Sequence, residues 1–191
     1  MRQTHTDDKF FLTTIDGGIH EGYLRRMRRS DAFPKEGAML AVAFGHDGKI
    51  RLGNALGHMR TFLESNTLEG IPAVAAGPYS LVAAYYVAEA LDETELSTMI
   101  QHIKRLLLPG GSLMVVTRLE KGVVNRLRGE CTRLGLHEVQ ADFWRTEPLN
   151  TWDQRGDDGR LLSPLAQRIP PLRNWRAQTA SLLYVMNQNN N

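Results

Sequence analysis

Three glycines near the N-terminus form the first group of residues that could bind a ligand. Gly17, Gly18 and Gly22 follow a strand-like segment at 9–15 and precede apolar residues at helical spacing. Glycines between a strand and a helix let the backbone approach a phosphate group at the helix N-terminus. Their spacing differs from the usual dinucleotide-binding pattern, however. We therefore expect them mainly to form a tight strand-to-helix turn.

Carboxylates and aromatic rings follow the apolar segment at 79–87. Glu89 and Asp92 come after the carboxyl end of this predicted strand, where open α/β sheets place their binding sites. Asp92 is better explained as the N-cap of the next helix. Tyr85 and Tyr86 could stack on an adenine in an active enzyme, or could be core and rim residues of the strand end.

Cysteine and histidine do not form a reactive or metal-binding set. Cys131 is the only cysteine, which excludes an internal disulfide and a multi-cysteine metal site. Its place on an apolar helix stripe favours core packing over a nucleophilic role. His46 and His58 are expected on the surface, and no histidine stands near carboxylates at metal-ligand spacing. We predict no catalytic, cofactor-binding or metal residues.

Basic and aromatic residues mark two segments that could contact a partner. Four arginines surround Met27 in the segment 25–29, where they could meet a phosphate backbone or an acidic protein, although a solvated helix face is the default expectation. Trp152, Trp175 and the arginine-rich segment 160–176 could form a docking surface or pack a loop down. The net charge is only +2 and is spread along the chain, so nucleic-acid binding is not expected.

Length and composition predict one globular domain. The chain has 191 residues, of which 42% are apolar and 23% charged, and no apolar stretch reaches the length of a membrane span. The first residues lack the apolar core of a secretory signal, and the single cysteine suits a reducing compartment, so we expect a cytoplasmic location. The predicted domain covers 1–186, with a long loop excursion at 145–178 and a polar tail at 187–191. The oligomeric state stays open.

Strand-like and helix-like patterns alternate along the chain, which predicts a doubly wound α/β sheet. The surest helix covers 93–108, with Asp92 and Glu95 as a capping box and Pro109–Gly111 at its end. Gly45–Gly48 is expected to turn the chain. We expect strands at 9–15, 38–44, 71–76 (a short edge strand), 79–87, 112–117, 139–144 and 181–186, and helices at 19–27, 52–63, 93–108 and 124–134.

Two assignments of the first strand are open. If 9–15 is first, the glycine segment 16–22 is the ligand loop, and the second strand, 38–44, carries no acid at its end to hold a ribose. Asp47 lies three residues beyond it. If 38–44 is first, Gly45–Gly48 becomes the loop, and too few residues remain before Tyr79 for the missing elements. We favour the first assignment because every element finds a place.

The segment Tyr79–Thr117 resembles the second half of class I S-adenosylmethionine methyltransferases. The matching pieces are YSLVAAYYVAEAL, DETELSTMIQHIKRLLL, PGG and SLMVVT, and the finish HEVQADFW followed by ASLLYVMNQ also suits that family. The resemblance implies a shortened, mostly parallel Rossmann-like sheet with an antiparallel last strand. It also leaves open a small active methyltransferase that binds S-adenosylmethionine through an irregular loop at Gly17–Gly22.

Most of the chain resembles one family in particular, the N-terminal domain of the anamorsin family of cytosolic iron–sulfur assembly factors. The similarity lies in the order and spacing of GHDGKIRLGNALGHMRTFLE, YSLVAAYYV, the 93–108 helix and PGGSLMVV. It implies a non-catalytic scaffold that docks an electron-donating diflavin reductase. Iron–sulfur clusters would belong to a cysteine-rich module beyond this chain, which has Cys131 alone. A third reading is a methyltransferase relic that binds RNA through the arginines at 25–29.

Overall fold

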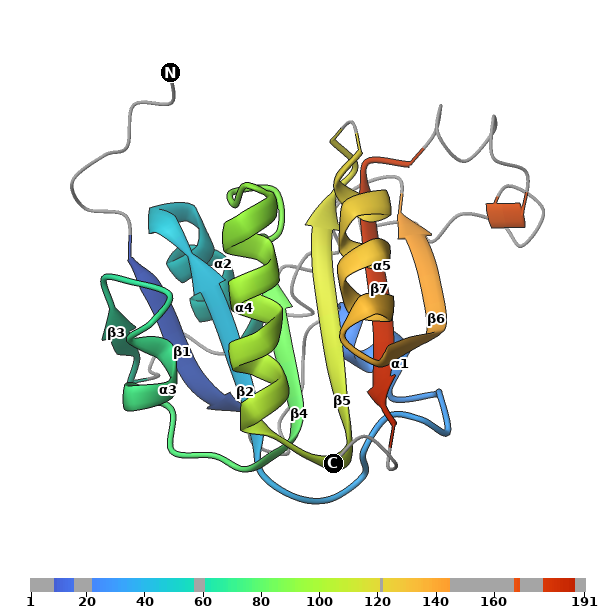
Figure 1. Ribbon diagram of the computed structural model, residues 1–191. Helices are drawn as coiled ribbons and strands as arrows, with labels where there is room; N and C mark the ends of the chain where they lie inside the picture. The colour runs from blue at the N-terminus through green and yellow to red at the C-terminus, as the bar shows by residue number, and fades with distance from the viewer. Residues whose placement is uncertain are drawn as a thin grey trace.

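A mixed sheet with helices on both faces forms the centre of the molecule (Figure 1). The computed structural model describes residues 9–15, 22–56, 61–120, 122–144, 167–168 and 177–187. Within them, seven strands pair in the order β3-β1-β2-β4-β5-β7-β6. The strands are β1 (Phe10–Ile15), β2 (Met39–Phe44), β3 (Leu63–Ser65), β4 (Tyr79–Tyr85), β5 (Leu107–Arg118), β6 (Leu136–Trp144) and β7 (Thr179–Met186); the helices are α1 (Gly22–Met27), α2 (Gly45–Leu56), α3 (Ile71–Val74), α4 (Glu93–Leu106) and α5 (Val123–Arg133).

The strand directions confirm the predicted fold class and add one reversal. β2, β4 and β5 are parallel neighbours, and the last strand, β7, runs antiparallel between β5 and β6. This is the doubly wound α/β sheet with an antiparallel last strand that the sequence predicts. β1 was expected to run with β2, but it pairs antiparallel with both β2 and β3.

The two faces of the sheet carry different helices. α3, α4 and α5 cover one face, while α1 and α2 cover the other, as Figure 1 shows. β4 is buried along its whole length, with Val82 packing toward the first set of helices and Leu81 toward the second. A strand enclosed in this way is a continuous apolar run, which is the pattern that predicted it.

Helix α4 has the predicted N-terminus. The Asp92 carboxylate accepts from the Glu95 backbone N–H at 2.9 Å, and the Glu95 carboxylate accepts from the Asp92 N–H at 2.9 Å, so the capping box is complete. The helix ends at Leu106, before the predicted 108, because Leu107 is already extended and pairs with Tyr79. The segment Pro109–Gly111, which was expected to follow the helix, lies within β5, where the register between β5 and β4 shifts.

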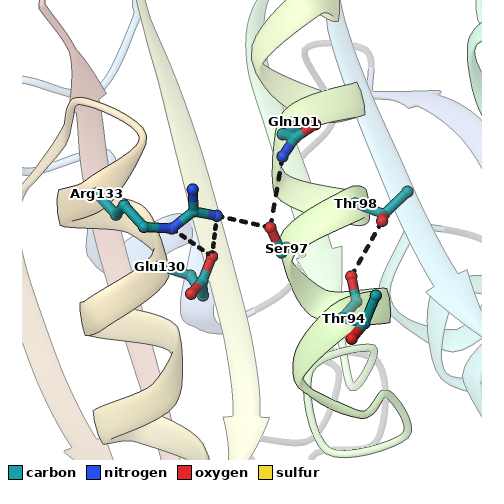
Figure 2. Close-up of polar contacts among 6 residues, drawn as sticks. All are labelled: Thr94, Ser97, Thr98, Gln101, Glu130 and Arg133. Atoms are coloured by element: carbon teal, nitrogen blue, oxygen red, sulfur yellow. Dashed lines mark hydrogen bonds and ion pairs between the residues drawn. The ribbon is translucent and has the colours of Figure 1, made fainter.

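Polar side chains join α4 to its neighbour α5 on the outer surface. The Arg133 guanidinium donates to Ser97 Oγ at 2.7 Å and also pairs with Glu130 on its own helix (Figure 2). On α4, Gln101 donates to the same Ser97 hydroxyl, at 3.4 Å. Beneath this surface layer, Leu127 and Cys131 of α5 are buried in the same core as the apolar face of α4.

Three expectations for the first half are wrong. Gly45–Gly48 is not a turn but the first turn of α2, because Gly45 takes a φ of 73° and lets strand β2 pass directly into the helix. The helix predicted at 52–63 begins earlier, at Gly45, and is described as far as Leu56, whereas Leu63 begins the edge strand β3. The segment predicted as a strand at 71–76 forms α3, with Pro72 in its first turn, where the missing N–H is not needed.

Much of the predicted loop excursion lies outside the described residues, which include only 167–168 and 177–178 of the segment 145–178. The predicted tail is described only at Asn187. The division into a domain at 1–186 and a tail therefore stays a prediction. In the described part of the chain, no helix is long and apolar enough to cross a membrane.

Candidate functional site

The carboxyl ends of four strands meet at one edge of the sheet. Phe44, Tyr85, Arg118 and Trp144 end β2, β4, β5 and β6, and β6 is parallel to β5 through the intervening β7. The helix that follows β2 covers one face, and the helix that follows β4 covers the other. Open α/β sheets bind ligands at such a switch point, outside the carboxyl ends of the strands. This edge is therefore the candidate site.

The reversed strand β1 makes the favoured assignment of the ligand loop wrong. β2, not β1, lies beside β4, in the position that the first strand holds in doubly wound sheets. Ile15, the last residue of β1, pairs with Met39 at the start of β2. The chain therefore leaves β1 at the edge opposite the candidate site. Gly17 and Gly18 lie outside the described residues, and Gly22 begins α1.

The connection from β2 to α2 does not fit the backbone requirement of the methyl donor. β2 ends at Phe44 and α2 begins at Gly45, so no loop residue separates them. The Gly45 N–H, which would face a ligand at this helix end, donates to the Lys9 carbonyl at 3.0 Å. A loop whose amides cradle an anionic or nucleotide group is absent from this described strand-to-helix junction.

The neighbouring strand does not supply an acid for a ribose. Because β1 is reversed, its end at the candidate edge carries Phe10 and Lys9. On the edge strand β3, the carboxylate of Glu64 pairs with Lys9 and Lys49 at 3.3 Å each. Hydrogen bonds from these two ammonium groups lower the pKa of Glu64. Among the described residues, this half of the edge does not fit S-adenosylmethionine.

The other half of the edge holds a carboxylate after β4. Glu89 accepts a hydrogen bond from Thr117 Oγ1 at 2.7 Å and from the Arg118 backbone N–H at 3.4 Å. Burial raises the pKa of Glu89, although its hydrogen bonds to Thr117 and Arg118 act in the opposite direction. A carboxyl group with a raised pKa keeps its proton to a higher pH than an ordinary glutamate does.

Beside this carboxylate, aromatic rings and one guanidinium group gather around Tyr86. Tyr86 has a φ of 56°, an uncommon conformation for a tyrosine, and its N–H bonds to the Val116 carbonyl at 2.8 Å. Its hydroxyl lies 3.1 Å from that of Tyr23 on α1, and the Arg118 guanidinium lies 6.0 Å from its ring centre. The Tyr23 ring packs edge-on against Trp144.

The predicted site residues have different roles in the structure. Asp92 is the helix cap, as predicted, and Glu89 is the carboxylate at the candidate edge. Tyr85 is a core residue, whereas the partly exposed Tyr86 belongs to the edge. Cys131 is fully buried, and burial raises the pKa of its thiol to about 12, which confirms core packing over a nucleophilic role.

The basic segment divides by role. Arg25, Arg28 and Arg29 are exposed, but Arg26 makes two hydrogen bonds, at 3.1 and 3.4 Å, to the buried carboxylate of Asp142 on β6. The side chain of His46, the whole of His58, and Trp152 and Trp175 lie outside the described residues, as does the segment 160–176 except 167–168. In the described ranges, no three histidine, cysteine or carboxylate side chains gather as a metal site would require.

Several edge residues escaped the sequence prediction. Thr117 and Arg118 end a buried strand, and polar residues at a strand's carboxyl end are a signal that could have found them. Tyr23 and Trp144 give no such signal, because tertiary packing brings them together from α1 and β6.

No protein-family model matches the sequence, and no curated protein is detectably similar to it. Among solved structures, a precorrin 8w decarboxylase of Methanobacterium thermoautotrophicum is 14% identical with a TM-score of 0.42, over 74% of this chain and 65% of that one. A methyltransferase from Pyrococcus furiosus is 12% identical with a TM-score of 0.38, over 60% and 44%.

The N-methyltransferase NodS of Bradyrhizobium japonicum WM9, solved with S-adenosyl-L-homocysteine, is 14% identical with a TM-score of 0.35, over 58% of this chain and 47% of that one. The chain thus spans less than two thirds of the length of each of these three proteins. Such remote likenesses do not transfer an activity, so function is inferred below from the residues of this chain.

Proposed function

We propose that this chain is a non-catalytic, methyltransferase-like scaffold that binds a partner protein. The observation that carries the proposal is the reversal of β1, which removes two features of a cofactor site together. The chain leaves β1 at Ile15, at the edge of the sheet opposite the candidate site. The reversal also puts Lys9 and Phe10 where an acid would hold a ribose. The sheet itself keeps its core, so a folded protein remains without this chemistry.

The finer form of the proposal follows the resemblance to the anamorsin family. The partner is then a diflavin reductase, and the setting is cytosolic iron–sulfur cluster assembly. The exposed arginines at 25, 28 and 29 support this form, because a basic surface attracts an acidic protein. The cofactors of the pathway would reside in other modules and partners, and this chain would contribute only binding.

Binding to a purified diflavin reductase tests the proposal. In a calorimetric titration of the full chain, we expect a saturable complex whose affinity is unchanged by 1 mM S-adenosylmethionine. An active class I methyltransferase of similar size serves as the control and should not bind the reductase. Absence of binding would refute the reductase as the partner, and loss of binding on adding the methyl donor would refute the cofactor-independent scaffold.

A second candidate is a small S-adenosylmethionine-dependent methyltransferase. The observation that favours it is the gathering of Tyr86, Glu89 and Arg118 at the carboxyl edge, where open α/β sheets bind substrates. The backbone strain at Tyr86 is typical of functional positions. This candidate requires measurable binding of the methyl donor, which the scaffold does not.

A further inference from the structure

We infer that the exposed arginines at the end of α1 and in the turn after it form the docking surface for an acidic segment of a partner protein. This arginine surface consists of Arg25, Arg28 and Arg29. The inference rests on the proposed scaffold function and adds to it the site of contact and the chemistry of the partner.

The three guanidinium groups have no internal partner among the described residues. Elsewhere in those residues, basic side chains pair with acids: Lys9 and Lys49 with Glu64, and Arg128 with Glu138 at 2.7 Å. The described part of the chain gives the arginine surface no such pair. Arg25 lies on α1, and Arg28 and Arg29 lie in the turn that follows it, so three like charges are close together in the chain and repel one another. An external anion would relieve that repulsion.

The surface is rigidly supported from below. Tyr23, Leu24 and Met27, on the inner side of α1, are buried against the sheet. Arg26 anchors the helix to the buried Asp142 of β6. The turn continues past the helix end through the bond from the Arg28 N–H to the Leu24 carbonyl, at 2.8 Å. A preorganised backbone lowers the entropy lost when the arginines bind.

The residues in and after the arginine surface favour a protein over a nucleic acid as its partner. The exposed basic residues here are few, and the exposed carboxylates of Asp31 and Glu36 follow them in the loop after α1, so the surface lacks the extended basic stripe that tracks a phosphate backbone. A short group of exposed arginines is typical of protein interfaces, in which arginine is enriched.

A labelled peptide of ten glutamates is the probe. Fluorescence anisotropy at low salt should show saturable binding to the full chain. Replacing both Arg25 and Arg29 by Glu should weaken this binding about tenfold or more, because two attractions become repulsions. The matched control replaces Lys104 and Arg105 by Glu, the same change in charge on α4 at the other face of the sheet, and should weaken binding less than about twofold.

Three outcomes overturn the inference: no saturable binding of the peptide, equal weakening by both double variants, or tighter binding of a ten-nucleotide single-stranded DNA than of the peptide. Far-ultraviolet circular dichroism and thermal unfolding verify that both variants are folded. Should either variant be unfolded, Arg25→Gln with Arg29→Gln and Lys104→Gln with Arg105→Gln replace them, with the same order of effects expected.

The reductase titration separates this inference from the proposed function. If the reductase binds the original chain and the Arg25→Glu, Arg29→Glu variant equally, the scaffold function stands and the docking surface is wrong. If the reductase does not bind but the peptide does so through the arginines, the acidic docking surface stands and the reductase is the wrong partner.

Discussion

The two halves of the sheet differ in how completely they retain the doubly wound pattern. In the half built from β4, α4, β5 and α5, the strands are parallel and buried, and the long helix α4 has a complete capping box at its N-terminus. In the half built from β1, β2, α2 and β3, one strand is reversed, the edge strand has three residues, and a helix follows its strand without a loop.

The difference between the halves matches the separate demands of folding and of cofactor binding. A parallel pair with a capped crossover helix buries apolar surface whether or not a ligand is bound. A ligand loop and a ribose acid, in contrast, contribute to binding but little to the core. The half that needs only to fold is regular, and the half that would hold the methyl donor is altered.

Core truncation gives the largest expected contrast between the halves. Leu96 of α4 and Leu52 of α2 are both fully buried leucines. α4 contacts α3, α5, β4 and β5, whereas α2 contacts β1 and β2. A cavity under α4 should therefore relax less, so Leu96→Ala should cost about 4 kcal/mol of unfolding free energy and Leu52→Ala about 2–3 kcal/mol. Urea unfolding of both variants measures this, and an equal or reversed order would contradict it.

The link between α1 and β6 should give the next largest effect. Arg26→Met leaves the buried carboxylate of Asp142 without its ion pair, and we expect a loss of about 2–3 kcal/mol in unfolding free energy. Arg25→Met on the same helix removes an exposed side chain and should change stability by less than about 0.5 kcal/mol. Similar losses in the two variants would show that Asp142 does not depend on Arg26.

The capping box at the N-terminus of α4 should make a smaller contribution to the stability of the regular half. Asp92→Ala removes the acceptor of the Glu95 N–H and should reduce the unfolding free energy by about 1 kcal/mol. The control is Glu93→Ala, in the same first turn, with an expected loss of a few tenths of a kcal/mol. Thermal and urea unfolding give both values; a loss in the control as large as in Asp92→Ala would argue against the cap.

The smallest expected effect is a change in pH dependence at the candidate edge. Burial raises the folded-state pKa of Glu89 above its ordinary value of 4.5. At pH values between 4.5 and this folded-state pKa, the folded state therefore binds more protons than the unfolded state. Stability from this group is therefore lost as the pH rises from 4.5 through the folded pKa. Glu89→Gln lacks this loss, so its unfolding free energy relative to that of the original chain should increase as the pH rises over that window. A constant or decreasing difference would contradict the raised pKa.

Patterns within single elements predicted the regular half, whereas the altered half depends on pairing between distant segments. Asp92 with Glu95 marks the start of α4, and the apolar run at 79–87 marks β4, because these signals are local. Strand direction has no local signal: 9–15 has the same composition in a parallel or an antiparallel strand. Leu63 fitted the helical spacing of the segment 52–63, but in the structure it pairs with Leu12 of β1 and belongs to strand β3.

The candidate site shows the same division. The carboxyl edge, Glu89 and the cap at Asp92 follow from the position of a strand end. The placement of Tyr23 against Tyr86 and Trp144 requires the path of α1 beneath the sheet, and the edge at which the chain leaves β1 requires the direction of that strand. Neither can be obtained from the spacing of residues along the chain.

Calorimetric titration of the full chain with S-adenosylmethionine, and separately with S-adenosyl-L-homocysteine, tests the central claim most directly. The reversed β1 and the direct β2-to-α2 junction predict no saturable heat up to about 1 mM ligand, which corresponds to a binding free energy weaker than about −4 kcal/mol. One-to-one binding with a dissociation constant in the micromolar range would contradict the claim and favour the active methyltransferase.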